Sequence, residues 1–382
     1  MKEKITPYKR IIIIISVLIM IFNAISFIRP FSDFYADNIY GVIADFLGKI
    51  MDIFPFAVGE ILMYLFAFLF VLTIFLSALL LLLHRRESYK RFLKKYIKAM
   101  LLIFLSVLLI YTLNWVIPFR ASILSDKRLG RNAYVRAYSI EELETLRSYI
   151  VDKLNETSEA VERDENGRLI YRDDETVRKE LALSMKALGD EYPRLKGYYP
   201  DIKKAFCSSV LEWMNIGGYN YPYTMEATYN EYVTRLYFPS LYAHEISHHH
   251  GYYQENEANF LSYLGCINSD DAFIRYSGYI DAFFYVDDAY ITSLIEAIGK
   301  EKALEIYKNQ PMPKKQIYTD EAEASIEASS RYEENSHPME KLKDKAEKAA
   351  DKGWEMQEKM VYGNYYEDVV GLLLYYYNGK LY

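Results

Sequence analysis

Four of the chain's six histidines lie within seven residues, in the stretch YAHEISHHHGYYQENEANFLSY that runs from Tyr242 to Tyr263. Within this stretch His244, Glu245 and His248 form the pattern H-E-x-x-H. Residues i and i+4 lie on the same face of an α-helix, so both imidazoles can reach one metal ion. Neutral imidazole nitrogens are typical ligands of Zn²⁺. The spacing therefore predicts a zinc site on a helix.

The position of Glu245 indicates a general base rather than a ligand. It lies one step round the helix from His244, where its carboxylate can face the open coordination position of the metal. There it can take a proton from a water molecule whose pKa the metal lowers to about 7. The predicted chemistry is hydrolysis by zinc-activated water, with Glu245 as the catalytic base.

A third zinc ligand is predicted on the next helix. Gly251 can end the first helix in the left-handed conformation that favours glycine, and a second helix begins at Glu255. Glu255 and Glu257 both lie in its first turns. We favour Glu255, because Asn259 lies one turn further and could hydrogen-bond a ligand histidine, whereas the apolar Leu261 follows Glu257. Glu257 stays the alternative ligand.

Neighbouring polar residues have less definite roles. We expect His249 and His250 to be surface residues or to support the ligands from outside. Glu226 could support the site or bind substrate, or could equally be a solvated carboxylate. A tyrosine hydroxyl near the site could stabilise an oxyanion, and the candidates are Tyr242, Tyr252 and Tyr253. Because the chain has 38 tyrosines, closeness in sequence does not favour any of the three.

Bulk composition excludes some functions. The net charge of −7 leaves no domain-wide basic surface to neutralise phosphates, which argues against a nucleic-acid-binding protein. The two cysteines, Cys207 and Cys266, are too few for a disulfide scaffold. They could form one bond or be two buried free thiols.

Three uncharged runs mark the N-terminal third of the chain. They cover residues 11–28, 61–83 and 99–119. A helix of roughly 20 apolar residues crosses the hydrocarbon core of a bilayer, so each run predicts a transmembrane helix. The first run lacks a clear cleavage site after it, and we expect it to stay as an anchor. Residues 1–119 are therefore predicted to form a membrane domain embedded in a lipid bilayer.

The distribution of Lys and Arg predicts the orientation of these helices. Basic residues crowd the N-terminal tail and the connection between the second and third runs. The connection between the first two runs holds only Arg29 and Lys49 among several acids. Cytoplasmic loops carry the basic excess, so the N-terminus should be cytoplasmic and the chain after Arg120 should lie outside the cytoplasm.

The remaining residues, 120–382, predict a mainly helical domain with a small β-sheet. Ser139 and Glu142 form a capping box at the start of one helix, and Ser240 is a candidate N-cap of the helix that carries H-E-x-x-H. Strands are predicted at KKAFCSSVLEW and at EYVTRLYF, which is rich in β-branched and aromatic residues. Further helices are predicted at DDETVRKELALSMKAL, at residues 270–279, 289–308 and 338–359, and in the C-terminal YYEDVVGLLLYYY.

The motifs HEISH and ENEAN resemble those of the gluzincin zinc metallopeptidases, whose glutamate helix reads E-x-x-A-D or E-x-x-A-N. The resemblance implies a zincin-like α+β domain in which His244, His248 and Glu255 bind zinc and Glu245 is the general base. The gap of six residues between His248 and Glu255 is short for gluzincins and requires a tight turn. Asn259 stands where many relatives have Asp.

The three apolar runs, the histidine stretch and the C-terminal YYEDVVGLLLYYY together resemble an uncharacterised family of bacterial membrane proteins, a domain of unknown function with this signature. The function that we expect is that of a membrane-anchored zinc metallopeptidase that hydrolyses peptide bonds outside the cytoplasm. Its predicted partners are a peptide or protein substrate, which could pair with the strand EYVTRLYF, and the bilayer, but no nucleic acid. Alternatives are a non-catalytic zinc-containing binding or sensor protein, and a zinc amidase acting on cell-wall material. The sequence leaves the oligomeric state open.

Overall fold

The computed structural model describes residues 6–124, 138–336 and 368–382, and the chain divides into two compact units. The first unit contains the chain up to Ala121 together with the segment Asn220–Glu226. The second contains Ser122–Tyr219 and Ala227–Tyr382. The fold is mainly helical with one small sheet of three strands, as the sequence predicted.

The first unit is helical throughout its described residues outside the segment 220–226 and short connections. Its helices are α1 (Pro7–Ile25), α2 (Arg29–Tyr35), α3 (Gly41–Met51), α4 (Val58–Leu83), α5 (Glu87–Tyr111) and α6 (Ile117–Phe119), with π-helical turns η1 (Ala36–Tyr40) and η2 (Thr112–Val116).

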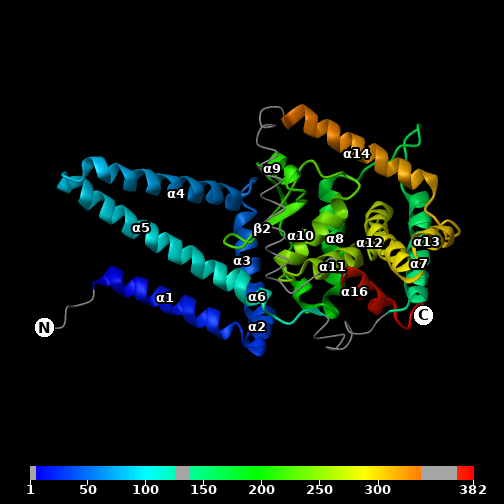
Figure 1. Ribbon diagram of the computed structural model, residues 1–382, viewed down its shortest axis with the longest axis horizontal. Helices are drawn as coiled ribbons and strands as arrows, with labels where there is room; N and C mark the ends of the chain where they lie inside the picture. Colours follow the sequence, from blue (N-terminus) through cyan, green and yellow to red (C-terminus); the bar gives the residue numbers. More distant parts are fainter. Residues whose placement is uncertain (1–5, 125–137, 337–367) are drawn as a thin grey trace. The chain divides into compact units, whose positions relative to one another are not determined.

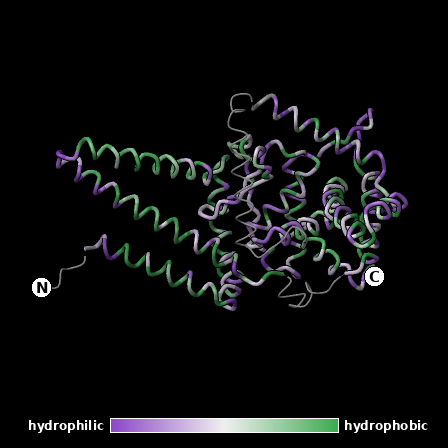
Figure 2. Tube along the Cα trace, viewed as in Figure 1, coloured by the Kyte–Doolittle hydropathy of each residue, from purple (hydrophilic) through white to green (hydrophobic). Residues whose placement is uncertain are grey.

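Three of these helices are long and apolar enough to cross a membrane, which confirms the three predicted runs. They are α1, α4, and α5 with its continuation to Phe119. The apolar stretches of α1 and α4 bury no residue inside the protein, and Figure 2 shows their hydrophobic character along most of their length. Helix α5 packs against both α1 and α4. Helix α5 begins at Glu87, well before the uncharged run that starts at residue 99. Charged residues do not end a helix, so the helical backbone extends through the basic segment that precedes the apolar one.

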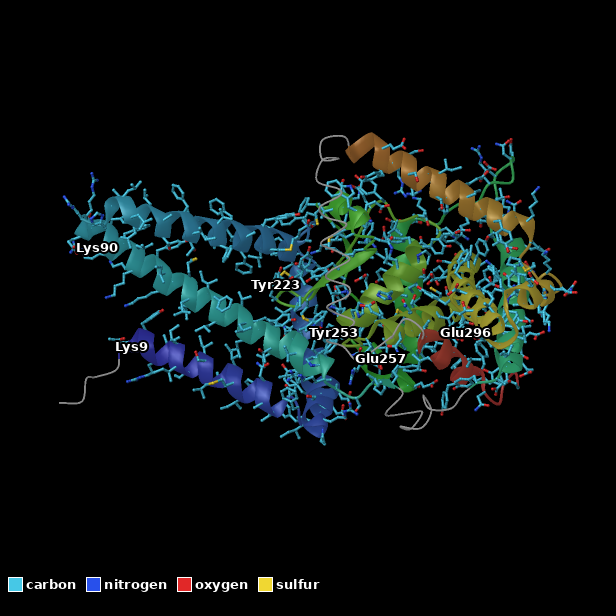
Figure 3. All side chains as sticks on the ribbon, viewed as in Figure 1. Lys9, Lys90, Tyr223, Tyr253, Glu257 and Glu296 are labelled. Carbon is cyan, nitrogen blue, oxygen red and sulfur yellow. The ribbon has the colours of Figure 1, made fainter. Side chains whose placement is uncertain are left out.

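The short helices between α1 and α4 were not predicted, because acidic residues interrupt this segment and it contains no long uncharged run. Lys9 of α1 and Lys90 of α5 lie toward one end of the three long helices (Figure 3). Tyr223 lies at the other end (Figure 3), where its hydroxyl donates to the carbonyl of Gly59 at the start of α4.

The segment 220–226 is held within the first unit by specific hydrogen bonds. The Glu226 carboxylate accepts the backbone N–H groups of Val58 at 3.0 Å and Gly59 at 2.6 Å, the first donors of α4. Asn114 donates to a backbone carbonyl of the segment at 2.8 Å. Glu226 is therefore buried as a cap of α4, and the alternative that it is a solvated carboxylate is wrong.

The second unit packs most of its helices around α11 and α12 (Figure 1). Its α-helices are α7 (Ile140–Ala160), α8 (Asp174–Ala187), α9 (Ser208–Trp213), α10 (Phe238–His249), α11 (Glu255–Ile267), α12 (Ala272–Ile298), α13 (Lys300–Tyr307), α14 (Lys315–Ser336) and α16 (Asp368–Tyr377). Short 3₁₀ helices are η4 (Leu188–Asp190) and η5 (Pro193–Lys196). The strands β1 (Lys203–Lys204), β2 (Gly218–Tyr221) and β3 (Glu226–Tyr229) form a sheet of order β1-β3-β2, with β1 parallel to β3.

Several predicted elements of the second unit are confirmed. The capping box of Ser139 and Glu142 opens α7, and α8 begins after its N-cap Asp173. Helix α16 packs on α11, where the hydroxyls of Tyr377 and Tyr263 lie 2.7 Å apart. The short apolar C-terminal helix therefore packs on the core, as expected from its length, which is too short to cross a membrane.

The predicted strand EYVTRLYF is wrong. Residues 231–237 form turns, and the strand that precedes α10 is β3, closer to the N-terminus. The Asn230 side chain accepts the N–H of Tyr232 at 3.0 Å and so starts a turn. Arg331 donates to the carbonyls of Glu231 and Val233, which a strand would use for its ladder. These tertiary contacts override a β propensity that is weak on its own.

Other boundaries also differ. The segment KKAFCSSVLEW contains the two residues of β1 and then the helix α9, because the Ser208 hydroxyl bonds the carbonyl of Ala205 and turns the chain. Ser240 lies inside α10 rather than at its N-cap, and its hydroxyl donates to the carbonyl of Tyr237. One helix, α12, joins much of the two predicted at 270–279 and 289–308. The helix predicted at 338–359 lies outside the described residues. Both cysteines are free.

Candidate metal centre

Two helices joined by a tight turn carry the predicted ligands. Helix α10 contains His244, Glu245 and His248, and α11 begins at Glu255. Between them Gly251 adopts a positive φ of 83°, a conformation that side chains with a Cβ rarely take. Its N–H donates to the carbonyl of His248 at 2.9 Å. The predicted helix end at Gly251 is confirmed, and the six-residue connection is long enough for this reversal.

Three side chains converge between the two helices. The Nε2 atom of His244 lies 3.2 Å from one carboxylate oxygen of Glu255, and the Nε2 atom of His248 lies 3.6 Å from the other. The two imidazole rings stand nearly perpendicular, with centroids 4.7 Å apart. One donor atom from each residue falls within 4.8 Å of the others, so His244, His248 and Glu255 could hold a metal ion.

The second nitrogen of each ring is fixed by an oxygen acceptor. The Nδ1 atom of His244 lies 2.7 Å from Oδ1 of Asn259, and Nδ1 of His248 lies 2.8 Å from the carbonyl of Tyr252. An oxygen acceptor requires each Nδ1 to carry the proton, which leaves the lone pair of the neutral ring on Nε2. When both rings are neutral, their lone pairs therefore point into the space shared with Glu255. The bond from Asn259 to a ligand histidine is the one predicted from the sequence.

The charges of the three residues favour a cation at their centre. Burial by itself would raise the pKa of Glu255, but the charge of His248 and the hydrogen bonds of both histidines outweigh it and hold that pKa well below its usual range. Burial would likewise lower the pKa of His244, but the hydrogen bond and charge of Glu255 raise it to about 9. Without a metal the carboxylate thus holds a proton on the neighbouring imidazole. A metal ion would supply the same positive charge.

A family described as "Protein of unknown function (DUF3810)" matches residues 35–355. The chain belongs to this family. The match covers α10 and α11, and therefore every residue of the candidate centre, together with α4 and α5. Among curated proteins and among solved structures, no match was found.

Glu245 lies beside the three grouped residues and faces the sheet. Its side chain is buried, and its negative charge contributes to the raised pKa of His244. Its carboxylate packs against the backbone of Gly218 on β2, where a Cβ would lie only 2.3 Å from Oε1. The carbonyl of Thr228 on β3 would lie 2.6 Å from the same Cβ. Glycine at position 218 therefore leaves the room that the Glu245 carboxylate occupies.

Glu257, the alternative ligand, points elsewhere. It is buried, and its carboxylate accepts the backbone N–H of Leu124. Tyr253 stacks on the ring of His248, with centroids 6.3 Å apart and planes 15° from parallel, and Figure 3 labels both Tyr253 and Glu257. Glu255, one turn before Asn259, is thus the glutamate that the fold brings close to His244 and His248.

The two remaining histidines of the stretch are buried, so the expectation that they lie at the surface is wrong. They follow His248 at the end of α10 and turn into the core, where the His250 ring lies 4.5 Å from that of Tyr199. Burial, and then the charge of His249, lower the pKa of His250 well below its usual value. Among the described residues, neither histidine belongs to the group that could hold a metal.

Three residues near the centre were not identified from the sequence. They are Gly218, Arg194 and Asp281 of α12. Arg194 donates to the carbonyl of Gly251 at 3.0 Å, and its guanidinium lies over the Tyr252 ring. Burial raises the pKa of Asp281 to about 6, partly offset by the charge of His244 and by Ser240. All three are far from the motif along the chain, so no spacing rule could have found them.

Proposed function

We propose that this chain is a zinc metallopeptidase anchored in a membrane, with its metal centre outside the cytoplasm. The observation that carries the proposal is the geometry of the ligands: two Nε2 atoms and one carboxylate meet, while each Nδ1 is bound to an oxygen. Two histidines and a glutamate are the protein ligands of catalytic zinc in several peptidases, where the fourth position stays open.

A zinc ion bound by His244, His248 and Glu255 would lower the pKa of a water molecule and polarise the carbonyl of the scissile peptide. Glu245 accepts the proton of the attacking water on its carboxylate and gives it to the leaving amine nitrogen. The backbone of Gly218 fixes the position from which Glu245 does this. Asn259 and the carbonyl of Tyr252 keep both imidazoles in the tautomer that binds metal.

Charge distribution supports the proposed orientation. Lys9 and Lys90 lie toward one end of the three long helices (Figure 3), together with the basic connection between α4 and α5. A basic end is typical of the cytoplasmic side. Because α5 and its continuation lead away from that end, the chain that follows them, including the metal centre, is placed on the opposite side in this proposal.

The arrangement favours a catalytic site over a structural one. A structural zinc site closes with four protein ligands, and a histidine next to His248 would be the nearest candidate for the fourth. His249 and His250 instead point into the core. Glu245, which a structural site would not need, lies beside the ligand group. A zinc amidase acting on cell-wall material would use the same residues, but only a peptidase should cleave a library of ordinary peptides.

The proposal is tested by metal content and cleavage with the full-length protein in detergent. Elemental analysis should find about one zinc per chain in the wild type. His248→Ala and Glu255→Gln should lose the zinc, whereas Glu257→Gln, the matched control, should keep it. Glu245→Gln should keep the zinc and lose cleavage of a mixed peptide library. A folded wild type that takes up no zinc would refute the metal centre, and equal cleavage by Glu245→Gln would refute the role of Glu245.

A further inference from the structure

Helix α3 in the first unit has one face packed on its neighbours and an apolar face that the protein leaves uncovered. The packed face consists of Tyr40, Ala44 and Gly48, which are buried and recur every four residues. On the opposite side lie Val42 and Phe46, which are 70% and 63% exposed. A helical repeat of 3.6 residues places these two sets on opposite sides. Ile53, which is 75% exposed, lies in the turn that follows the helix.

Charged residues border this uncovered face without interrupting most of it. The helical repeat places Asp45 and Asp52 on one edge, beside Gly41, and the partly buried apolar residues Ile43, Leu47 and Ile50 on the other edge. Lys49 lies within the exposed face, where its long stem can stay on apolar surface while its ammonium reaches water. The result is an amphipathic helix whose apolar side is outward.

The direction of α3 matches a position at a membrane surface. In the first unit, α3 runs across the directions of α1, α4 and α5 (Figure 1). It lies in the chain between the C-terminal end of α1 and the N-terminal end of α4. Large apolar residues are also exposed on the membrane-crossing candidates, among them Phe68 and Val71 of α4.

We propose that α3 is an interfacial helix whose Val42 and Phe46 face lies in the boundary between lipid headgroups and acyl chains, on the bilayer side that holds the C-terminal end of α1. The occupant of this face is lipid. Residues 26–57 contain four acids and two bases, so apolar burial rather than attraction to anionic headgroups binds the helix. The proposal needs the membrane location of α1, α4 and α5 and is independent of the metal centre.

Site-directed spin labelling of the full chain tests the proposal. Single cysteines replace Val42 and Phe46 in a Cys207→Ser background, and the protein is placed in nanodiscs of phosphatidylcholine. The unsubstituted background reports any labelling of the buried Cys266. Val71→Cys on α4 gives the reference for acyl chains, and Leu183→Cys on α8 gives the reference for water. Gly41→Cys is the matched control, since a side chain there meets nothing within 4 Å and points to the acidic edge.

Power saturation with oxygen and a nickel chelate then measures depth. Labels at 42 and 46 should favour oxygen over nickel and lie about 5–10 Å below the phosphates, shallower than the label at 71. Labels at 41 and 183 should favour nickel. The proposal is overturned if the labels at 42 and 46 match the one at 183, or if they lie as deep as that at 71. Spin–spin broadening at 46 that disappears on dilution with unlabelled protein would also overturn it, because a second copy would then cover the face.

Discussion

The Nδ1 atom of His244 lies 2.7 Å from the amide oxygen of Asn259, one turn along α11 from Glu255. The same helix therefore supplies a candidate ligand and the group that orients a second ligand. An amide oxygen accepts the imidazole proton as a carboxylate does, but without its charge. Asn259 thus fixes the tautomer of His244 while adding less negative charge to the centre than Asp would.

Replacing Asn259 should change metal affinity in a predictable order. Asn259→Leu removes the acceptor and should weaken zinc binding about 10–100-fold, a typical cost of losing such a partner. Asn259→Asp keeps the acceptor and should bind zinc at least as tightly as the wild type. Competition with a chromophoric chelator measures both affinities. Asn268→Leu, at the other end of α11, is the control, and equal affinity of Asn259→Leu and wild type would contradict the assigned role.

Substitution of Gly218 should separate metal binding from catalysis. The Cβ of Gly218→Ala would meet Glu245 Oε1 at 2.3 Å and a backbone carbonyl at 2.6 Å, so the carboxylate must move. We expect the zinc content to stay at the wild-type level, while peptide cleavage falls by about tenfold or more. Gly217→Ala is the matched control, because the atom nearest to its Cβ would be the flexible end of Leu241, at 3.0 Å. Unchanged cleavage by Gly218→Ala would show that the packing of Glu245 on β2 is unimportant.

Loss of the Glu226 carboxylate should destabilise the first unit. It accepts the N–H groups of Val58 and Gly59, and both donors would lose a charged acceptor in Glu226→Ala. The expected cost is about 1–3 kcal/mol. Thermal unfolding of the full chain in detergent should show a lower melting temperature for Glu226→Ala. The exposed Glu296→Ala should melt as the wild type does, and a shared melting temperature for both variants would contradict the capping role.

The pH dependence of stability should reveal Asp281. Burial raises its pKa from 3.8 to about 6, so the folded protein binds this proton more tightly than the unfolded chain does. The contribution of this bound proton to the stability of the folded state is fully present below pH 3.8 and is lost as the pH rises through 6. Asp281→Asn, which never ionises, should therefore be more stable than the wild type at pH 7.5, by on the order of 1–3 kcal/mol.

At pH 4 the two proteins should unfold at similar temperatures, since Asp281 is then largely protonated. The comparison is made in the presence of a chelator, so that metal binding at His244 does not contribute. Greater stability of the wild type at pH 7.5 would mean that the ionised carboxylate is stabilised by a partner and that burial does not dominate.

Local periodicity made much of this structure predictable. His244 and His248 are one helical turn apart whatever surrounds them, and Gly251 is the residue that most easily takes the positive φ of a helix end. The long uncharged runs of α1, α4 and α5 are likewise recognisable without any contact, because length and hydropathy alone identify them. The capping box at Ser139 depends on residues only three positions apart.

Elements stabilised by distant residues were the ones predicted wrongly. EYVTRLYF has the composition of a strand, but Arg331, about a hundred residues away, binds its carbonyls and keeps it in turns. His249 and His250 were predicted to lie at the surface, because nothing in their sequence neighbourhood shows that both are buried or that Tyr199 and Arg194 lie against His250. The role of Glu226 depends on Val58, which lies 168 positions earlier.

Sequence alone was enough to predict the two-helix motif, the three apolar helices and the types of residue available to a metal, because each follows from spacing or composition within a short stretch. Which glutamate meets the histidines depends instead on how the helices pack. Glu255 and Glu257 differ by two positions, and their side chains point to opposite sides of α11. The packing of α11 on α10 turns Glu255 toward the two Nε2 atoms and turns Glu257 toward the backbone of Leu124. The orientation of one helix against another is a property of the whole core.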